Sequence, residues 1–403
     1  MNSVLSPTAI LPVYGNPTLA FARGEGCYLW SEDGRRYLDF GSGIAVCSLG
    51  HCHPHLVKTL QDQAATLWHC SNIYRIPLQE RLARRLVDAS FADYVFFSNS
   101  GAEAIEATIK ITRKYHDETG NPDRWRIITV NGAFHGRTLT CISAAGNPKY
   151  LKGFTPVVEG FDHVAFGNLN ELRAAITDNT AGIMIEPIQG EGGIRASSMD
   201  YLKQLRTICD EFGLLLIFDE IQCGMGRTGK LFAHEWAGIT PDVLATAKGI
   251  GSGFPIGATL VTKKAAAGMS QGVHGTTFGG NPLAMAVGNG VLDVVLAPGF
   301  LERVTQMGRR LQAALTDIVA QHRSVFEEVR GSGLILGLKC VLPNTDVIKA
   351  LQEAGLLTIS AADNVIRIIP PLVIDETHIA EAADILEKVA KSLAAKSAQE
   401  KVA

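Results

Sequence analysis

The 403-residue sequence lacks several features that mark specialised protein classes. It contains no run of about 18 apolar residues, so no membrane-spanning helix is expected. No Lys or Arg precedes Arg23 and no apolar segment follows the start, so a secretory signal is not expected either. Lys and Arg (37) nearly balance Asp and Glu (40), giving a net charge of −3 without a basic stripe. This balance argues against a nucleic-acid or anionic membrane partner.

The cysteines and glycines also exclude classes of protein. None of the eight cysteines forms a CxxC pair, which predicts reduced thiols and a cytoplasmic location and argues against a disulfide framework. The 41 glycines follow no Gly-X-Y period. Hydrophobic residues make up 46% of the chain and charged residues 19%, which is enough apolar material for a large core. The length predicts two or three domains.

From about residue 78 the sequence alternates amphipathic helices with short, continuous apolar strands. Such strands are buried on both faces, as in a parallel sheet. The pattern predicts an α/β fold with a large, mostly parallel, doubly wound sheet. The helices are expected at 78–87, 102–116 and 199–213, and the strands at 94–99, 126–130, 181–187, 214–220 and 242–247.

The pattern changes after Gly290. A long amphipathic helix is expected at 299–322, followed by strands within 324–341 and at 365–371, which predicts a smaller α+β domain. Two alternating runs flank Asp33-Gly34 and predict a hairpin that packs with this domain. We therefore divide the chain into an N-terminal segment, 1–45, a large domain, 46–290, and a C-terminal domain, 291–403.

Two segments resemble known motifs only superficially. The segment 223–230 (CGMGRTGK) spells both GxGxxG and GxxxxGK, but Leu231 stands where a P-loop has Ser or Thr. The segment 51–55 (HCHPH) gathers three His and one Cys, yet no distant partner cluster suggests zinc. Turns are the better interpretation of both, with Pro54 at a helix start in the second.

Three expected strands end on residues with complementary chemistry. A Ser/Gly turn at 98–102 opens a helix, whose N-terminus attracts phosphate. Asp219 and Lys248 each follow a buried strand, and ligands bind outside the carboxyl ends of such strands. Lys could form a Schiff base and Asp could protonate a pyridine nitrogen, which together match pyridoxal 5′-phosphate (PLP). At this point the alternatives are that Asp219 is only a structural residue and that Lys248 is only a solvated surface charge.

Longer stretches of the sequence match a known family. The chain resembles the class III (fold type I) PLP-dependent aminotransferases, and within them the acetylornithine aminotransferase branch. The resemblance runs from about residue 19 to 375. It is carried by LDFGSGIAVCSLGHCHP, SNIYRIPLQERLA, FFSNSGAEAIEATIK, GAFHGRT, IEPIQGEGG, LIFDEIQCGMGRTGKLFA, DVLATAKGIGSGFPIGA, HGTTFGGNPLA and IRIIPPL.

The resemblance implies a role for particular residues. Lys248 corresponds to the Schiff-base lysine and Asp219 to the partner of the pyridine nitrogen. Arg137, with Thr276 on the same wall, would bind the substrate carboxylate, while Arg367 would bind the second carboxylate of 2-oxoglutarate and pair with Glu191 when idle. A permanent Glu191–Arg367 salt bridge is the alternative. The remaining cofactor contacts implied are Gly101, Ala102, Phe134, Glu220, Ile221, Gln222 and, from the neighbouring subunit of a homodimer, Thr277.

The implied reaction moves the δ-amino group of N2-acetyl-L-ornithine to 2-oxoglutarate in two half-reactions. It yields N-acetyl-L-glutamate 5-semialdehyde and L-glutamate, a step of arginine biosynthesis. The sequence leaves succinylornithine, succinyldiaminopimelate, ornithine and 4-aminobutyrate open as donors. A non-catalytic PLP-fold regulatory protein is the alternative from another class, although such a protein would ordinarily have lost Lys248.

Overall fold

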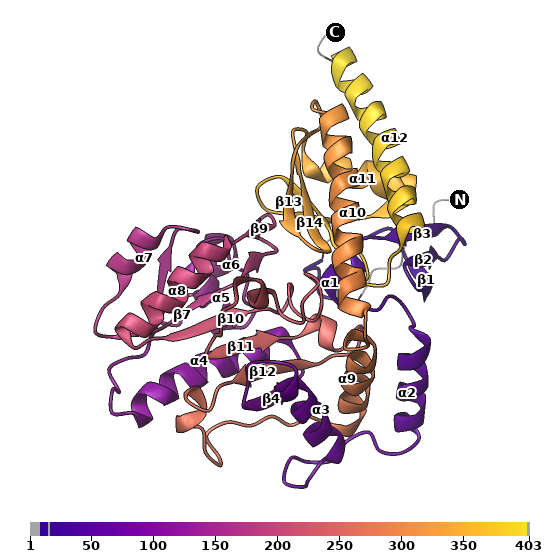
Figure 1. Ribbon diagram of the computed structural model, residues 1–403. Coiled ribbons are helices and arrows are strands. Elements are labelled where there is room, and N and C mark those ends of the chain that lie inside the picture. Colours follow the sequence, from indigo (N-terminus) through magenta and orange to yellow (C-terminus); the bar gives the residue numbers. More distant parts are fainter. Residues whose placement is uncertain (1–8, 15–16, 401–403) are drawn as a thin grey trace.

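The structure is a computed structural model that describes residues 9–14 and 17–400. At its centre lies a seven-stranded sheet in the order β4-β12-β11-β10-β7-β5-β6 (Figure 1). Only β12 runs antiparallel to its neighbours β11 and β4; the other pairings are parallel, which confirms the predicted mostly parallel α/β sheet. The strands are β4 (Tyr94–Ser98), β5 (Arg126–Val130), β6 (Phe161–Val164), β7 (Thr180–Ile185), β10 (Leu215–Asp219), β11 (Val243–Thr246) and β12 (Gly257–Val261).

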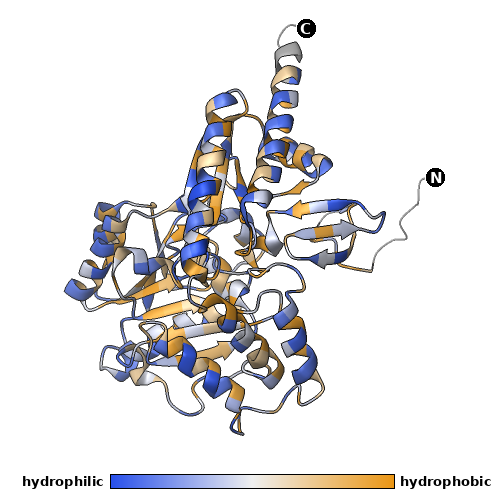
Figure 2. Ribbon diagram, turned by 45° about the vertical axis from the view of Figure 1, so that its right-hand side comes forward, coloured by the Kyte–Doolittle hydropathy of each residue, from blue (hydrophilic) through white to orange (hydrophobic). Residues whose placement is uncertain are grey.

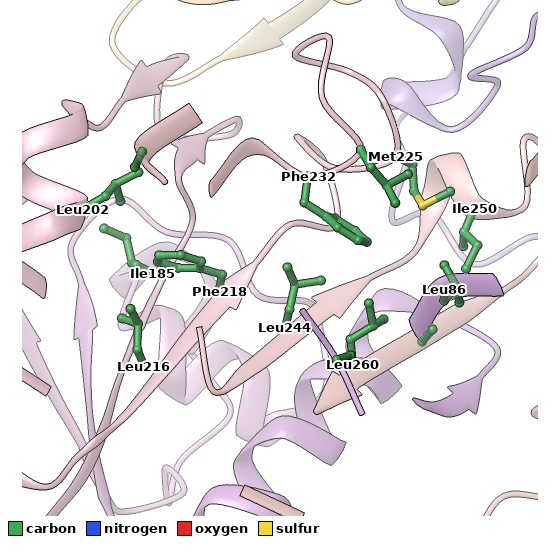
Figure 3. Close-up of a cluster of buried hydrophobic side chains, with 14 of the residues drawn as sticks. Leu86, Ile185, Leu202, Leu216, Phe218, Met225, Phe232, Leu244, Ile250 and Leu260 are labelled. Carbon is green, nitrogen blue, oxygen red and sulfur yellow. The ribbon is translucent and has the colours of Figure 1, made fainter. Parts of the chain in front are cut away.

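Helices cover both faces of this sheet, which explains the continuous apolar strands. Leu216 and Phe218 of β10 pack on one face with Leu202 (Figure 3), whereas Leu215 and Ile217 pack on the other. The first face is covered by α3 (Pro77–Asp88), α7 (Leu169–Ala175), α8 (Met199–Phe212) and α9 (Pro282–Val295), with α2 (Pro54–Ala64) against α9; the second is covered by α4 (Gly101–Glu118) and α5 (Leu139–Ala145).

A second sheet, β13-β14-β17-β16, lies with the C-terminal helices above the large sheet (Figure 1). Buried apolar residues of its strands and helices form one core cluster. Hydrophilic and hydrophobic residues alternate along the ribbons of its long helices (Figure 2). This region comprises α10 (Phe300–Gln321), β13 (Phe326–Ser332), β14 (Ile335–Cys340), α11 (Asn344–Ala354), β15 (Leu356–Leu357), β16 (Ile359–Ala361), β17 (Val365–Ile368) and α12 (Glu376–Glu400).

The N-terminal strands join this C-terminal region. β2 (Tyr28–Ser31) pairs with β3 (Arg36–Asp39) as the predicted hairpin, and β1 (Phe21–Glu25) flanks β2. β3 also pairs in parallel with β15, so the predicted packing of the two ends of the chain is found. The division at residues 45 and 290 stays a proposal; residue 290 lies within α9.

The remaining elements are short. They are α1 (Ser42–Ala45), α6 (Pro148–Leu151), β8 (Ile188–Gln189), β9 (Arg195–Ala196) and the 3-10 helices η1 (Ala233–Ala237), η2 (Lys248–Ile250) and η3 (Ala265–Gly268). Within residues 9–14 and 17–400, no single helix has the length and apolar composition to cross a membrane. The pair α9 and α10, bent by 70°, meets those two criteria only when taken together.

Candidate active site

The Ser/Gly turn after β4 forms one wall of the site. Ser100 caps α4 by accepting a hydrogen bond from the Glu103 N–H at 3.2 Å. Gly101 opens the helix, and a Cβ there would lie 2.9 Å from Ile221 Cδ1, so glycine permits the close approach of α4 to the segment after β10. First-turn amides have no intrahelical acceptor and carry the positive end of the helix dipole. The turn is therefore suited to an anion such as phosphate.

Asp219 ends β10 with only 3% of its surface exposed. Its Oδ2 atom lies 2.8 Å from His135 Nδ1, and its Oδ1 atom accepts a hydrogen bond from the Ile221 N–H at 3.0 Å. Burial lowers the pKa of His135 but the Asp219 carboxylate outweighs it, so the net shift of that pKa is upward. His135 thus places a fixed hydrogen bond behind the Asp219 carboxylate, and its raised pKa favours the protonated ring.

Glu186, directly after β7, is a third buried ionisable group beside this pair. Burial, reinforced by the charge of Asp219, raises the pKa of Glu186 to about 7. Its carboxylate accepts hydrogen bonds from the Phe134 N–H at 2.8 Å and the Gly190 N–H at 3.3 Å. Sequence reasoning missed both Glu186 and His135. The available signals differed: Glu186 is a carboxylate directly after the buried strand β7, and His135 follows the predicted residue Phe134.

Lys248 follows β11 and begins η2. Its φ of +47° is a left-handed conformation that non-glycine residues seldom adopt. Such conformations persist where the surrounding structure holds them, and they concentrate at functional sites. Burial lowers the pKa of the Lys248 amine, against the opposing attraction of Asp219. A lowered pKa favours the neutral, nucleophilic amine.

A cavity of about 310 Å³ joins these elements at the carboxyl ends of the strands. Gln222 also reaches it, and the Gln222 Oε1 atom is buried without a hydrogen-bond partner among the described residues. His135 and Glu186 line it as well. The structure thus brings together seven of the predicted residues, namely Gly101, Ala102, Phe134, Asp219, Ile221, Gln222 and Lys248.

Three predicted residues lie elsewhere. The Glu220 side chain is fully buried against η1, where it accepts hydrogen bonds from the Ala233 and His234 amides, and it does not line the cavity. Thr276 and Thr277 line a separate hollow of about 430 Å³. Thr276 Oγ1 accepts a hydrogen bond from the Gly279 N–H at 3.1 Å. Neither threonine lines the cavity that holds Asp219 and Lys248.

Arg137 lies on the ring of Tyr150, with its guanidinium carbon 4.0 Å from the ring centroid, and 5.4 Å from that of Phe134. A cation over an aromatic face is attracted to the ring while its N–H groups remain available in the plane. Among the residues that the structure describes, no carboxylate pairs with Arg137. Its donors are therefore free for a substrate carboxylate.

Arg367, on β17, carries the second cation. Its side chain is 3% exposed, and its Nη2 atom lies 2.9 Å from Glu191 Oε2 and donates to the Ser360 carbonyl at 2.7 Å. Burial lowers the pKa of Arg367, and Glu191 opposes that effect. The Nε and Nη1 atoms of Arg367 are buried without a partner in the described part of the chain. Two unused donors in a buried guanidinium are a strong binding site for a carboxylate.

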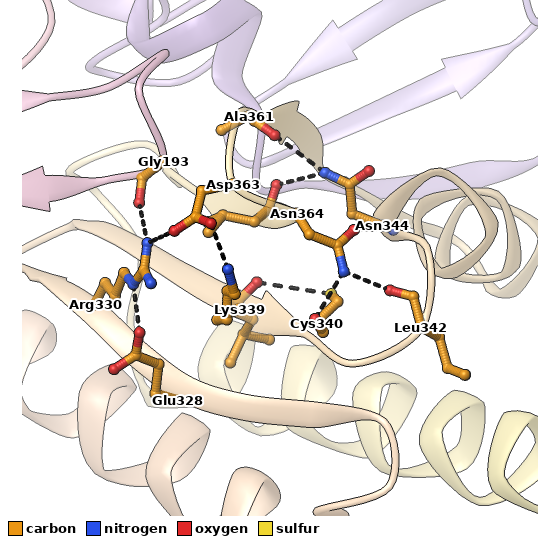
Figure 4. Close-up of polar contacts among 12 residues, drawn as sticks. Gly193, Glu328, Arg330, Lys339, Cys340, Leu342, Asn344, Ala361, Asp363 and Asn364 are labelled. Atoms are coloured by element: carbon orange, nitrogen blue, oxygen red, sulfur yellow. Dashed lines mark hydrogen bonds and ion pairs between the residues drawn. The ribbon is translucent and has the colours of Figure 1, made fainter. Parts of the chain in front are cut away.

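The backbone around Glu191 is fixed to the C-terminal region. The Ala362 N–H donates to the Glu191 carbonyl at 2.9 Å, and Arg330 donates to the Gly193 carbonyl at 3.4 Å. Figure 4 shows Arg330 paired in turn with Asp363, which also binds Lys339 at 2.5 Å. The Glu191 side chain can therefore move while its backbone stays in place.

The two superficial motifs have structural roles. His51 Nε2 lies 2.8 Å from Asp39 Oδ2, and His55 Nε2 lies 2.9 Å from Asp293 Oδ2, so these imidazoles bind separate carboxylates. In the segment 223–230, Gly226 and Gly229 adopt positive φ within a turn. The Lys230 ammonium lies 5.3 Å from the centroid of the Trp236 ring.

The chain matches known proteins along nearly its whole length. It is 58% identical over 380 residues to the acetylornithine aminotransferase of Brucella melitensis, covering 94% of each chain. The N-acetylornithine aminotransferase structure from Stenotrophomonas maltophilia superposes with a TM-score of 0.84 at 37% identity, covering 96% of this chain and 99% of the other. The ornithine aminotransferase from Toxoplasma gondii gives a TM-score of 0.92 at 31% identity, covering 96% and 94%.

The family profile described as aminotransferase class-III matches residues 11–390. This span contains the helix N-terminus, the strand-end Asp219 and Lys248, and both arginines. The chain therefore belongs to the class III aminotransferases and is an enzyme of that family.

Proposed function

We propose that the enzyme transfers the δ-amino group of N2-acetyl-L-ornithine to 2-oxoglutarate, in arginine biosynthesis. The observation that carries this proposal is the pair of cations: Arg137 without an ionic partner, and the buried Arg367 with two unused donors beside a displaceable Glu191. N-acetylornithine has one carboxylate and 2-oxoglutarate has two. An Arg137 that is always available and an Arg367 that Glu191 covers can distinguish these two substrates. The 58% identity to an acetylornithine aminotransferase supports the same donor.

The cofactor implied by the family is PLP, and the residues lining the cavity fit it. The α4 N-terminus suits its phosphate, Phe134 offers a flat apolar face for its ring, and Asp219 suits its pyridine nitrogen. Gln222 Oε1 is buried with no partner and suits the ring hydroxyl. When bound, PLP supplies a carbonyl carbon for Lys248 and for the substrate amine, and a ring that takes up negative charge.

The chain's own residues then divide the work. Burial lowers the pKa of Lys248, which favours the neutral amine as the nucleophile and afterwards as the base that takes the proton from the amine-bearing carbon. Asp219 would keep a proton on the pyridine nitrogen of the cofactor, and His135 holds the Asp219 side chain in place. Arg137 binds the α-carboxylate of N-acetylornithine, which orients its δ-amine toward Lys248. Glu191 covers Arg367 until the second carboxylate of 2-oxoglutarate displaces it.

We further propose a homodimer in which Thr277 completes the partner's cofactor site, while the adjacent Thr276 is assigned to the substrate wall. They lie outside the cavity of their own chain, beside the exposed aromatic side chain of Phe278. Trp68 and Ile73 are also exposed, and His69 stacks near Phe278 at 5.3 Å between ring centroids. Exposed large apolar groups gathered in one region are typical of a subunit interface. All eight cysteines are free thiols, in keeping with a cytoplasmic location.

The test is a donor panel with 2-oxoglutarate held constant and glutamate as the product measured. We expect N-acetylornithine to have the highest kcat/KM, ahead of N-succinylornithine, succinyldiaminopimelate, ornithine and 4-aminobutyrate. Loss of absorbance on borohydride reduction, absent in Lys248→Ala, would place PLP on that lysine. A preference for ornithine, or for 4-aminobutyrate, would overturn the donor assignment. Absence of any glutamate would instead favour a non-catalytic protein.

A further inference from the structure

Tyr150, in α6, contacts both of the cation sites described above. Its ring carries the Arg137 guanidinium, and its hydroxyl donates to Glu191 Oε1 at 3.4 Å. The ring also meets Phe134 edge-on, with centroids 6.0 Å apart. None of the residues predicted from the sequence makes this set of contacts. Tyr150 therefore contacts both Arg137 and Glu191.

The Glu191 carboxylate is shared unequally between two donors. Oε2 lies 2.9 Å from Arg367 Nη2, whereas Oε1 accepts the longer bond from Tyr150. In the described part of the chain, no other donor reaches this carboxylate. In the proposed function, 2-oxoglutarate displaces Glu191 from Arg367 Nη2, and Glu191 then needs another partner because a partly buried, unpaired carboxylate is costly.

The position of the backbone limits where Glu191 can go. Its carbonyl is bound by the Ala362 N–H, and a Cβ on Gly192 would lie 2.6 Å from the Gly132 carbonyl oxygen, so the following residue is closely packed. The side chain must then turn about its own bonds. Tyr150 is the donor already in contact with its other oxygen, and the nearby Arg137 charge attracts a carboxylate toward the same side.

The hydroxyl of Tyr150 remains a donor throughout. Burial, reinforced by Glu191, raises the pKa of Tyr150 above its ordinary value. A raised pKa favours the protonated phenol, which can shorten its hydrogen bond to Glu191 when that carboxylate leaves Arg367. If the Tyr150–Glu191 hydrogen bond is weak while Glu191 pairs with Arg367 and strong once Glu191 has left, it stabilises the displaced position of Glu191.

We propose that Tyr150 is a positioning residue that receives the Glu191 carboxylate whenever a substrate carboxylate occupies Arg367, while its ring holds Arg137 for the other substrate. Tyr150 thereby links Arg137 to Arg367 and helps the enzyme to distinguish the amino donor from 2-oxoglutarate. This inference rests on the proposed function, because it assigns 2-oxoglutarate to Arg367.

The experiment measures each half-reaction of the holoenzyme separately, from the absorbance change of the cofactor, in Tyr150→Phe and Tyr150→Leu. Tyr150→Phe keeps the ring and removes the hydroxyl. We expect it to weaken apparent 2-oxoglutarate binding about tenfold, the effect of losing one hydrogen bond to a charged group. Its effect on N-acetylornithine should be at least about three times smaller, since Glu191 stays on Arg367 in that half-reaction. Tyr150→Leu also removes the aromatic ring on which Arg137 lies and should weaken the binding of both substrates.

Two controls separate this role from a structural one. Tyr28→Phe removes another Tyr–Glu hydrogen bond, 2.9 Å from Tyr28 Oη to Glu381, outside the site and should change neither half-reaction. In the Glu191→Gln background the acceptor has lost its charge, so adding Tyr150→Phe should cost less than about twofold. Equal losses for both substrates, or the same loss in both backgrounds, would overturn the inference.

A failure of the proposed function would give a different result. In that case wild-type enzyme would reject N-acetylornithine, yet the 2-oxoglutarate half-reaction could still be run from the aminated cofactor. Tyr150→Phe would then be judged on that half-reaction against its effect in the Glu191→Gln background. The identity of the donor and the role of Tyr150 are thus decided by different measurements.

Discussion

Replacement of Glu191 by Gln should have opposite effects on the enzyme's use of its two substrates. The wild-type carboxylate lies 2.9 Å from Arg367 Nη2 and, in the proposed function, leaves that atom when the guanidinium binds 2-oxoglutarate. Gln keeps the size and an acceptor oxygen but removes the charge. We therefore expect tighter binding of 2-oxoglutarate and poorer use of N-acetylornithine.

The magnitude follows from the exposure of the pair. A hydrogen bond to a charged group contributes about 1.5 to 3 kcal/mol. Glu191 is 35% exposed, although Arg367 is 3% exposed, so solvent screening favours the lower end of that range. A gain of about 1.4 kcal/mol for 2-oxoglutarate corresponds to about tenfold tighter binding. N-acetylornithine should lose a similar factor, because an uncovered Arg367 competes with Arg137 for its carboxylate and holds it unproductively.

The assay is single-turnover absorbance of each half-reaction, with substrate concentration varied. Glu302→Gln is the matched control, because it makes the same chemical change at an exposed position on α10. If Glu191→Gln slowed both half-reactions by one common factor, Glu191 and Arg367 would form a permanent structural pair. The two-cation account would then be wrong for this protein.

Three further predictions concern the buried groups of the cavity. Lys248→Ala should reduce turnover by about 10³-fold or more while leaving the circular dichroism spectrum and the size of the particle unchanged, because it removes the nucleophile and base but little of the core; substantial remaining activity would move the Schiff-base role to another residue. Asp219→Asn should retain cofactor but slow the first half-reaction by about 10- to 100-fold, since an amide does not stabilise a protonated ring nitrogen; a normal rate would make Asp219 purely structural. Glu186 has a folded-state pKa of about 7 against an ordinary 4.5, so the unfolded chain ionises first and the native state loses stability as the pH rises through that interval. Glu186→Gln should therefore show a smaller fall in the free energy of unfolding between pH 5 and pH 8, measured by chemical denaturation, and an unchanged fall would contradict the buried ionisation.

Much of the fold and the site could be predicted from the sequence because the signals are local. Continuous apolar runs indicate strands buried on both faces, and parallel strands end at one edge of their sheet. Asp219, Lys248 and the turn at Gly101 each stand directly after such a run, so their meeting at one cavity follows from strand direction alone. The family resemblance added both arginines and Glu191.

The tertiary structure decided what depends on non-local distances. The sequence of β12 resembles that of any other buried strand, yet β12 runs antiparallel to β11 and β4. Only the pairing of strands in the sheet reveals this direction. Glu220 is adjacent to Asp219, but successive side chains near a strand end point to opposite sides, and Glu220 binds η1 instead of the cavity.

The same limit explains the missed residues. His135 is 84 positions from Asp219 and Tyr150 is 41 from Glu191, and no periodicity in the sequence relates positions so far apart. The sequence by itself determined which chemical groups stand at the ends of the strands, because hydrophobic patterning and strand direction are local properties. Which groups touch, which are buried and which remain without a partner was decided only by the packing of distant segments, because a side chain's partners and its dielectric surroundings are set by whatever the fold brings beside it.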